Sequence, residues 1–283
     1  MFGQVLTLSI LRLASAQLAE VFTVADKDAA VDFLSALQVE DGSFGDALDN
    51  YYAARSLQAL GAEVHNVAQL CETSAAAALD EDVEILAAAV ATLKTLHCKE
   101  LGTAGKHDRI KSALAAALAS DELKDVYFGL LGVASLDLAG SLPNDAIGRA
   151  VQTIAGQWDN AVDESVINAG FGFAGAAIAI GSGSAEGELW VAAEALLSRA
   201  EAIVQMAEDM GDGVKLLEFV DEEADVTDSV ANLRVTSIVL AGLSSLAAAV
   251  DIKLTIPAST MAKLAEYVLQ FKTPGTAEEA FYL

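Results

Sequence analysis

The stretch Tyr51-Tyr-Ala-Ala-Arg-Ser-Leu-Gln-Ala-Leu-Gly61 decides the fold of this chain, because its small and apolar residues form a compact helix that ends in Leu and Gly. Similar apolar stretches return at 85–96, 126–138, 166–181 and 230–246. Their starts lie 34, 41, 40 and 64 residues apart. A period of a few tens of residues is typical of stacked helical units. We therefore predict an all-α, single-domain protein of repeated helical hairpins, arranged as an α/α solenoid or toroid.

The composition favours the same fold class and limits the partners. The chain has 283 residues, of which 54% are hydrophobic and 20% charged, as expected for a globular domain. It contains only three prolines and many alanines, which are the best helix formers. The net charge of −25 repels nucleic acid and anionic lipid headgroups, so we expect neither as a partner. Such a surface is either simply solvated or attracts a basic partner.

Hydrophobic periodicity predicts helices over most of the chain. An Asp-Gly turn at Gln38–Gly45 and an extended segment at 214–219 interrupt them. Thr276–Leu283 starts like a further apolar helix without a partner, so we expect the chain to be a truncated piece of a longer protein. The helices are expected at 25–37, 47–60, 64–78, 82–97, 107–119, 121–138, 144–156, 162–180, 189–210, 227–248 and 258–271.

The first residues differ from the rest. Val5–Leu11 is a short apolar run, and Ala14-Ser15-Ala16 after it is typical of a cleavage site, so residues 1–16 are predicted to be a signal peptide and residues 17–283 the helical domain. The alternative is an amphipathic first helix. We expect no membrane span, because the longest apolar run, Val166–Gly181, is shorter than the roughly 18 to 20 residues that a bilayer requires.

Cys71 and Cys98 are the only cysteines, and each lies near the edge of a predicted helix. In an oxidising compartment they would form one disulfide, which the chain-entropy model values at about 3 to 4 kcal/mol. Two buried free thiols are the alternative, and the signal peptide is the feature that decides between them.

No catalytic, cofactor or metal site is expected. His97 precedes Cys98, but neighbouring helix positions point about 100° apart, so the two do not easily share a metal. Gly170–Gly175 satisfies G-x-G-x-x-G inside an apolar helix, where glycines favour close helix packing over dinucleotide binding. Asp80-Glu-Asp82 and Asp221-Glu-Glu223 lack calcium-loop spacing and are expected in the first turns of helices.

Several segments together resemble a known family. Asp49–Val64 has an acidic residue, an aromatic pair and a small-residue helix ending in Leu-Gly-Ala, and Cys71 and Cys98 follow. Leu189–Asp212 is similar to a long acidic helix that ends in a glycine turn, and Lys215–Phe219 to the short apolar stretch after it. This order resembles the N-terminal lumenal region of the ribophorin II family, subunit 2 of the eukaryotic oligosaccharyltransferase.

The resemblance implies a function without catalysis. Members of this family are structural subunits of the oligosaccharyltransferase complex, which supports protein N-linked glycosylation in the endoplasmic reticulum. It implies a location on the lumenal side of that membrane and contacts with other subunits, including the catalytic one. It implies no cofactor. Full-length members also carry a β-sandwich and membrane helices.

Two other functions stay open. One is a cytosolic adaptor built from helical repeats. The other is an enzyme of the α/α-toroid type, such as a prenyltransferase or terpene cyclase, because Gln38–Gly45 resembles the loop motif of those enzymes. Against the enzyme, the Asp-x-Asp-Asp motif of the cyclases is missing and no Asp, Cys and His trio for zinc can be assembled.

Overall fold

The structure is a computed structural model that describes residues 22–98, 104–138, 142, 146–182, 187–209, 217–220, 229–271 and 273–282. Helices dominate these residues and pack on one another as a single domain, which confirms the all-α prediction. The only strands in the described ranges, β1 (Glu208–Asp209) and β2 (Leu217–Glu218), form one short antiparallel ladder. This ladder confirms the extended segment predicted near 214–219.

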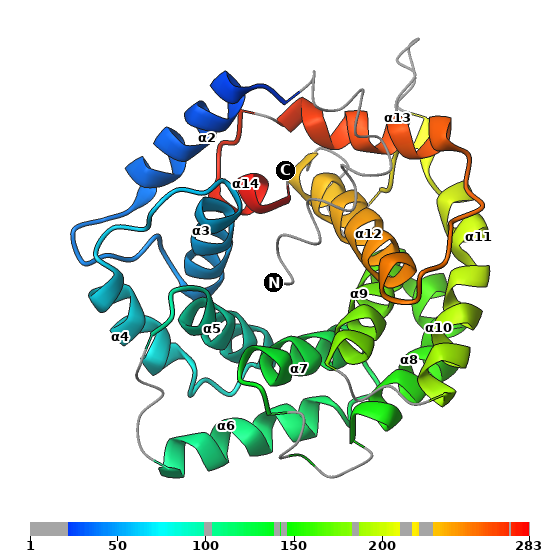
Figure 1. Cartoon of the computed structure of the whole chain (residues 1–283), viewed down its shortest axis with the longest axis horizontal. Coiled ribbons are helices and arrows are strands. Elements are labelled where there is room, and N and C mark those ends of the chain that lie inside the picture. The colour runs from blue at the N-terminus through cyan, green and yellow to red at the C-terminus, as the bar shows by residue number, and fades with distance from the viewer. Residues whose placement is uncertain are drawn as a thin grey trace.

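The helices form a closed ring with an inner and an outer layer (Figure 1). Each inner helix contacts its two neighbours in the ring, and the last of them contacts the first. The inner helices, in ring order, are α3 (Ala47–Ala59), α5 (Val83–Thr95), α7 (Leu123–Ser135), α9 (Ile167–Gly181), α12 (Ser229–Ala249) and α14 (Ala277–Tyr282).

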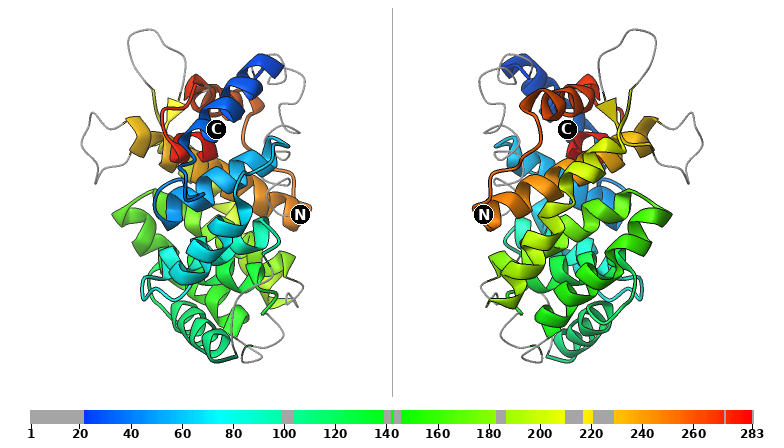
Figure 2. Two further views of the ribbon diagram at one scale, coloured as in Figure 1. Left: turned by 90° about the vertical axis from the view of Figure 1, so that its left-hand side faces the viewer. Right: turned by 90° about the vertical axis from the view of Figure 1, so that its right-hand side faces the viewer.

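The outer helices alternate with the inner ones along the chain and surround them (Figure 1). They are α2 (Val24–Leu37), α4 (Val67–Ala77), α6 (Ala104–Ala117), α8 (Ala146–Glu164), α10 (Glu188–Ser198), α11 (Ala200–Gln205) and α13 (Ala258–Val268), which a 3-10 turn, η2 (Leu269–Phe271), extends. Both side views place α6 at the opposite end of the molecule from α2 and α13 (Figure 2).

The five apolar stretches of the sequence all correspond to inner helices. They coincide with α3, α5, α7, α9 and α12, whose residues are mostly buried. An inner helix has neighbours on nearly every side, so it needs small and apolar residues all round. The predicted bounds agree with most helices to within a few residues, but α8 runs to Glu164, beyond the predicted end at residue 156.

Four inner helices end in the same way. At the ends of α3, α5, α7 and α12 an apolar residue is followed by one with positive φ: Gly61 (φ 70), His97 (φ 55), Asp137 (φ 54) and Asp251 (φ 53). The next backbone N–H then bonds back to the last turn, as in Cys98 N to Leu93 O at 2.9 Å. This is the Schellman pattern, which satisfies carbonyl groups left free at a helix end. It explains the Leu-Gly end of the first stretch and the Leu end of the second, where Leu60 and Leu96 precede the residue with positive φ.

Helix starts follow the capping rules. Asp46 accepts hydrogen bonds from the backbone N–H groups of Leu48 and Asp49, and Asp82 does the same at the start of α5. The carboxylates of the Asp80–Asp82 cluster thus satisfy backbone N–H groups, with Asp80 accepting from Asp82 N at 2.9 Å. The expectation that this cluster belongs to a helix start is confirmed.

Three expectations were wrong. The helix predicted over 189–210 is broken at Arg199 into α10 and α11 and gives way to β1. Thr276–Leu283 does not lack a partner helix, because α14 packs against α3 and α12. Ring closure brings the two ends of the domain together, which a linear pattern does not show.

The third error concerns length. Val230–Ala249 is long and apolar enough to cross a membrane by length and composition, so the expectation that no stretch reaches this length was wrong. This segment is nearly the whole of α12, however, and 67% of its most apolar window is buried within the ring. Its apolar character is therefore explained by its place in the core.

Candidate functional site

A disulfide joins an outer and an inner helix of the ring. Cys71, in the middle of α4, is bonded to Cys98, and their Cα atoms lie 5.8 Å apart. Cys98 is the third residue after α5, and the Schellman turn at His97 directs it back toward the helix. The predicted pairing is present, and neither cysteine is free as a nucleophile or metal ligand.

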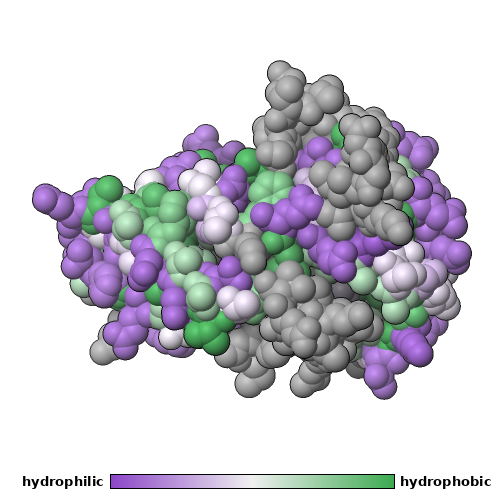
Figure 3. Space-filling model, turned by 90° about the horizontal axis from the view of Figure 1, so that it is seen from above, coloured by the Kyte–Doolittle hydropathy of each residue, from purple (hydrophilic) through white to green (hydrophobic). Residues whose placement is uncertain are grey.

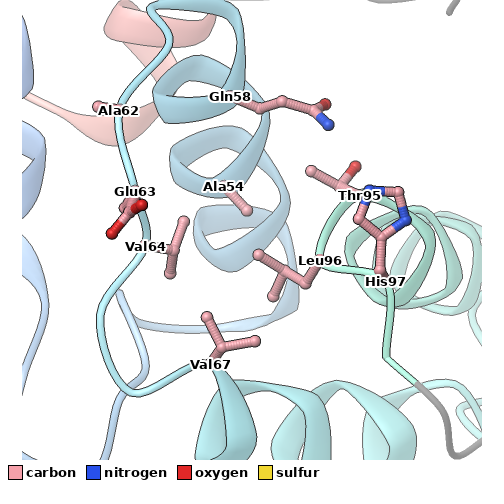
Figure 4. A pocket seen from close by; sticks show the side chains of 9 residues that line it. All are labelled: Ala54, Gln58, Ala62, Glu63, Val64, Val67, Thr95, Leu96 and His97. Carbon is pink, nitrogen blue, oxygen red and sulfur yellow. The ribbon is translucent and has the colours of Figure 1, made fainter.

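A pocket of about 410 Å³ is lined by residues near both cysteines in the sequence, Val67 one turn before Cys71 and His97 next to Cys98 (Figure 4). It is formed where the C-terminal ends of α3 and α5 meet the loop that leads into α4. We call it the α3–α5 pocket. Its lining residues are Ala54, Gln58, Ala62, Glu63, Val64, Val67, Thr95, Leu96 and His97.

The pocket has two chemically different halves (Figure 4). Aliphatic side chains, including Val64, Val67 and Leu96, point toward one another on one side. On the other side the Gln58 amide, the Thr95 hydroxyl and the His97 imidazole lie close together. Such a mixture of an apolar wall and a few convergent polar groups is typical of ligand sites.

The polar half has unused hydrogen-bonding capacity. Within the described part of the chain, the side chains of Gln58, Thr95 and His97 make no hydrogen bond. Thr95 as a residue is 8% exposed, but its hydroxyl oxygen is not among the fully buried atoms that lack a partner, so this oxygen keeps contact with solvent. Thr92, one turn earlier in α5, instead donates its hydroxyl to Ala88 O at 2.9 Å. The pocket therefore holds polar groups that a bound molecule could satisfy.

The loop between α2 and α3 is hydrogen-bonded to the loop that lines the pocket. Gly42, with φ 84, allows the tight turn, and Gln38 Nε2 donates to Gly42 O at 2.8 Å and to His65 O at 2.5 Å. Backbone and side-chain hydrogen bonds from Ser43 lower the pKa of Asp41. The predicted turn is therefore confirmed, and Phe44 after it is buried with residues of α3.

A second group of side chains lies where α14 closes the ring against α3. Tyr51, Tyr52, Phe281 and Tyr282 form a chain of aromatic contacts with ring centroids 4.9 to 5.8 Å apart. Burial raises the pKa of Tyr52, and burial raises the pKa of Tyr282 well above its usual range. These neutral hydroxyls pack and hydrogen-bond to each other, so we assign the group to ring closure.

The glycine motif packs helices together. A Cβ atom on Gly170 would lie 2.9 Å from the backbone carbonyl carbon of Ile238 in α12, and one on Gly172 would lie 2.6 Å from the Trp158 ring. Gly175 is similarly close to Ile154. These glycines lie in the middle of α9 and not in a loop before a helix, which confirms the packing interpretation over dinucleotide binding.

The remaining residues singled out from the sequence do not converge. His65 and His107 are exposed on different elements, and His97 lines the α3–α5 pocket. In the described ranges no group of three His, Cys, Asp or Glu side chains is placed to hold a metal ion. Asp221–Glu223, the glycine turn at 211–213 and the predicted signal peptide at 1–16 lie outside the described residues.

Sequence reasoning missed the α3–α5 pocket. Gln58 and Thr95 belong to no motif, and their proximity depends on two helix ends meeting in space. One signal was available, because Leu96-His97-Cys98 occupies the same place in its helix as Leu60-Gly61-Ala62. That parallel would have put His97 in a left-handed turn at the helix end.

Comparison with known proteins identifies the family of this ring. The model of the ribophorin II N-terminal domain matches residues 22–283. The chain belongs to this family. The ribophorin II resemblance of the sequence is thereby confirmed over nearly the whole chain.

A curated relative gives the same answer. Dolichyl-diphosphooligosaccharide–protein glycosyltransferase subunit 2 of Oryza sativa subsp. japonica is 25% identical over 273 residues. The match covers 91% of this chain and 38% of the relative. The chain thus spans less than half the length of the relative that it matches.

Proposed function

We propose that this chain is a non-catalytic structural subunit of the oligosaccharyltransferase complex and supports N-linked glycosylation on the lumenal side of the endoplasmic reticulum. The observation that carries the proposal is the ribophorin II N-terminal domain match over residues 22–283. The name of the rice relative, a glycosyltransferase subunit 2, supports the same complex. Other subunits of that complex, including the catalytic one, are the proposed partners.

The architecture supports a role in assembly more than one in chemistry. Close contacts at glycines and packed aromatic side chains close the seams between inner helices, and carboxylates at helix starts such as Asp82 are used as caps. Other charged groups form surface pairs such as Lys94–Asp137 at 2.7 Å. Hydrophilic residues cover most of the coloured surface seen from above, with small hydrophobic patches between them (Figure 3). Such a surface suits docking to neighbours at several points.

The Cys71–Cys98 disulfide supports the lumenal location. Disulfides persist in oxidising compartments and are rare in the cytosol. The predicted signal peptide at residues 1–16 would deliver the chain there, and it stays a prediction.

Co-purification tests the proposal directly. The tagged chain is expressed in eukaryotic cells depleted of their own subunit 2, and membranes are solubilised in a mild detergent. The catalytic subunit should co-purify with the chain, and an unrelated secreted helical protein with the same tag should recover none. Absence of every oligosaccharyltransferase subunit, from a chain that is folded and in the endoplasmic reticulum, would overturn the proposal.

The state of the two cysteines distinguishes the proposed function from that of a cytosolic adaptor. Mass spectrometry of a non-reduced digest, from chain made in secretory cells, should show the peptides of Cys71 and Cys98 linked. Free thiols at both positions would favour the adaptor. The toroid enzyme gains support from the loop motif at Gln38–Gly45 and from the ring shape, because the alternation of inner and outer helices is what such enzymes share (Figure 1).

A further inference from the structure

We infer that the α3–α5 pocket binds an extended, basic peptide segment of a partner chain. One aliphatic side chain of the peptide would pack against the apolar half of the pocket. The peptide backbone beside it would hydrogen-bond with Gln58 and Thr95. This inference does not rest on the proposed function, because it follows from the pocket alone.

The size and shape of the apolar half fit one aliphatic side chain. Val64, Val67 and Leu96 face one another above Ala54, which is fully buried and forms a wall (Figure 4). The volume of about 410 Å³ exceeds that of a single Leu or Ile side chain and leaves room for the adjoining backbone. Val67 is 36% exposed, so contact with a ligand would bury more of its apolar surface.

The polar half fits a peptide group. A primary amide such as that of Gln58 offers a donor and an acceptor side by side, which matches the N–H and C=O of a peptide backbone. Thr95, a residue that is 8% exposed, adds a hydroxyl that has no hydrogen bond in the described structure and points into the pocket (Figure 4). Its oxygen is not among the fully buried atoms that lack a partner, so a ligand would replace water at this hydroxyl.

Other ligand classes fit less well. The lining contains no Phe, Tyr or Trp, and sugars are usually held by stacking on the faces of these rings. Its only carboxylate is Glu63 and it has no Lys or Arg, so a phosphate or another anion would meet no fixed positive charge. A lipid chain would leave the three polar groups of the other half without partners.

Charge favours a basic peptide. Glu63 is exposed at the edge of the pocket, where it can pair with a cation of the ligand (Figure 4). The whole chain carries 41 acidic residues against 16 basic ones. Such a field attracts a segment with Lys or Arg beside its aliphatic residue and repels an acidic one.

Methyl NMR with defined peptides tests the inference. The probes are acetyl-Lys-Gly-Leu-Gly-Lys-amide, the same peptide with Ser in place of Leu, and the same peptide with Glu in place of both Lys. We expect the first probe to shift the methyl resonances of Val64, Val67 and Leu96. Affinity should fall by at least about tenfold for the Ser peptide and about threefold or more for the Glu peptide at low salt.

Two pairs of variants place the binding in this pocket. Thr95→Val keeps the volume but removes the hydroxyl, and should weaken binding by about three- to tenfold. Its control is Thr73→Val in α4, whose hydroxyl already donates to Leu70 O at 3.1 Å. Val67→Trp should block the pocket, whereas Val24→Trp, at the equivalent first position of α2 and 75% exposed, should leave binding unchanged.

The outcomes are decisive in both directions. Equal shifts by the Leu and Ser peptides, or no shift with any probe at millimolar concentration, would overturn the inference. Unchanged affinity in folded Thr95→Val and Val67→Trp would do the same. Failure here leaves the co-purification experiment unaffected, because that experiment reports assembly and not this pocket.

Discussion

Two seams of the inner ring contrast sharply. Between α9 and α12 the backbones themselves meet: a Cβ on Gly242 would lie 2.6 Å from the carbonyl oxygen of Gly170. Between α3 and α14 the contact is made by aromatic side chains, with the rings of Tyr52 and Phe281 centred 4.9 Å apart. At its glycines the first seam brings the two backbones together, whereas the second is filled by aromatic side chains.

The difference shows two ways to close a ring. α9 and α12 are long neighbours whose glycines let extensive surfaces meet at short distance. α14 has only six residues, so it needs large side chains to bury enough area. We call the α9–α12 contact the glycine seam and the α3–α14 contact the aromatic seam. We expect added volume to destabilise the first and lost volume to destabilise the second.

The largest expected effect is from Gly242→Val. The new side chain would meet the backbone of Gly170 and Ala174, which cannot rotate away, so we expect a loss of about 3 kcal/mol or more in the free energy of unfolding. Thermal or urea unfolding followed by circular dichroism measures it. Unfolding at the wild-type midpoint would show that the seam can open.

The matched control lies on an outer helix. Gly148 in α8 has no atom within 4 Å of the place that a Cβ would take, so Gly148→Ala adds volume without a clash. We expect it to stabilise the chain by about 0.5 to 1 kcal/mol, because alanine favours a helix over glycine. A loss comparable to that of Gly242→Val would mean that the seam geometry is not the cause.

Phe281→Ala tests the aromatic seam. Phe281 is half-buried and contacts Tyr51, Tyr52 and Tyr282, so its truncation should cost about 2 kcal/mol, less than the cost of a fully buried Phe. Phe281→Leu, which keeps more of the volume, should cost about half as much. Equal unfolding midpoints for Phe281→Ala and the wild type would show that α14 does not contribute to closure.

The smallest expected effect is from Tyr52→Phe, and it depends on pH. Burial raises the pKa of Tyr52 above that of a tyrosine in the unfolded chain, so its contribution is complete below about pH 10 and is lost as the pH rises further. At neutral pH the variant loses the hydrogen bond with Tyr282, at a cost of about 1 kcal/mol.

Above pH 10 the stability advantage of the wild type over Tyr52→Phe should shrink and then reverse. The wild type should lose stability more steeply than Tyr52→Phe, because only its unfolded state gains from ionising this hydroxyl. Urea unfolding between pH 8 and pH 11 measures the two slopes. Parallel slopes would contradict the placement of Tyr52 in a buried seam.

Much of the fold could be predicted from local pattern. Apolar residues on all sides of a helix require burial on all sides, and the five stretches with that pattern are inner helices. The Asp46 and Asp82 caps, the turn at Gly42 and the packing role of Gly170 also follow from nearest neighbours along the chain. The pairing of Cys71 with Cys98 was one of two alternatives, which the structure resolved.

The α3–α5 pocket and the partner of α14 could not be predicted in this way. Gln58 and Thr95 are ordinary polar residues near helix ends, and nothing in their own neighbourhoods indicates that they face each other. The break at Arg199 was also missed; the side chain of this residue reaches Asp159 on another helix, with 3.2 Å between Nη2 and Oδ2. Contacts between residues distant in sequence depend on the curvature of the whole ring.

The sequence by itself therefore determined the helices, their caps, the inner layer and the family, because these depend on residue type and on spacing along the chain. Only the tertiary structure decided that the ring closes through α14, that Cys71 and Cys98 meet, and that two helix ends leave a pocket between them. The physical reason is that packing angles accumulate from helix to helix, and only their sum brings residues 51 and 281 together.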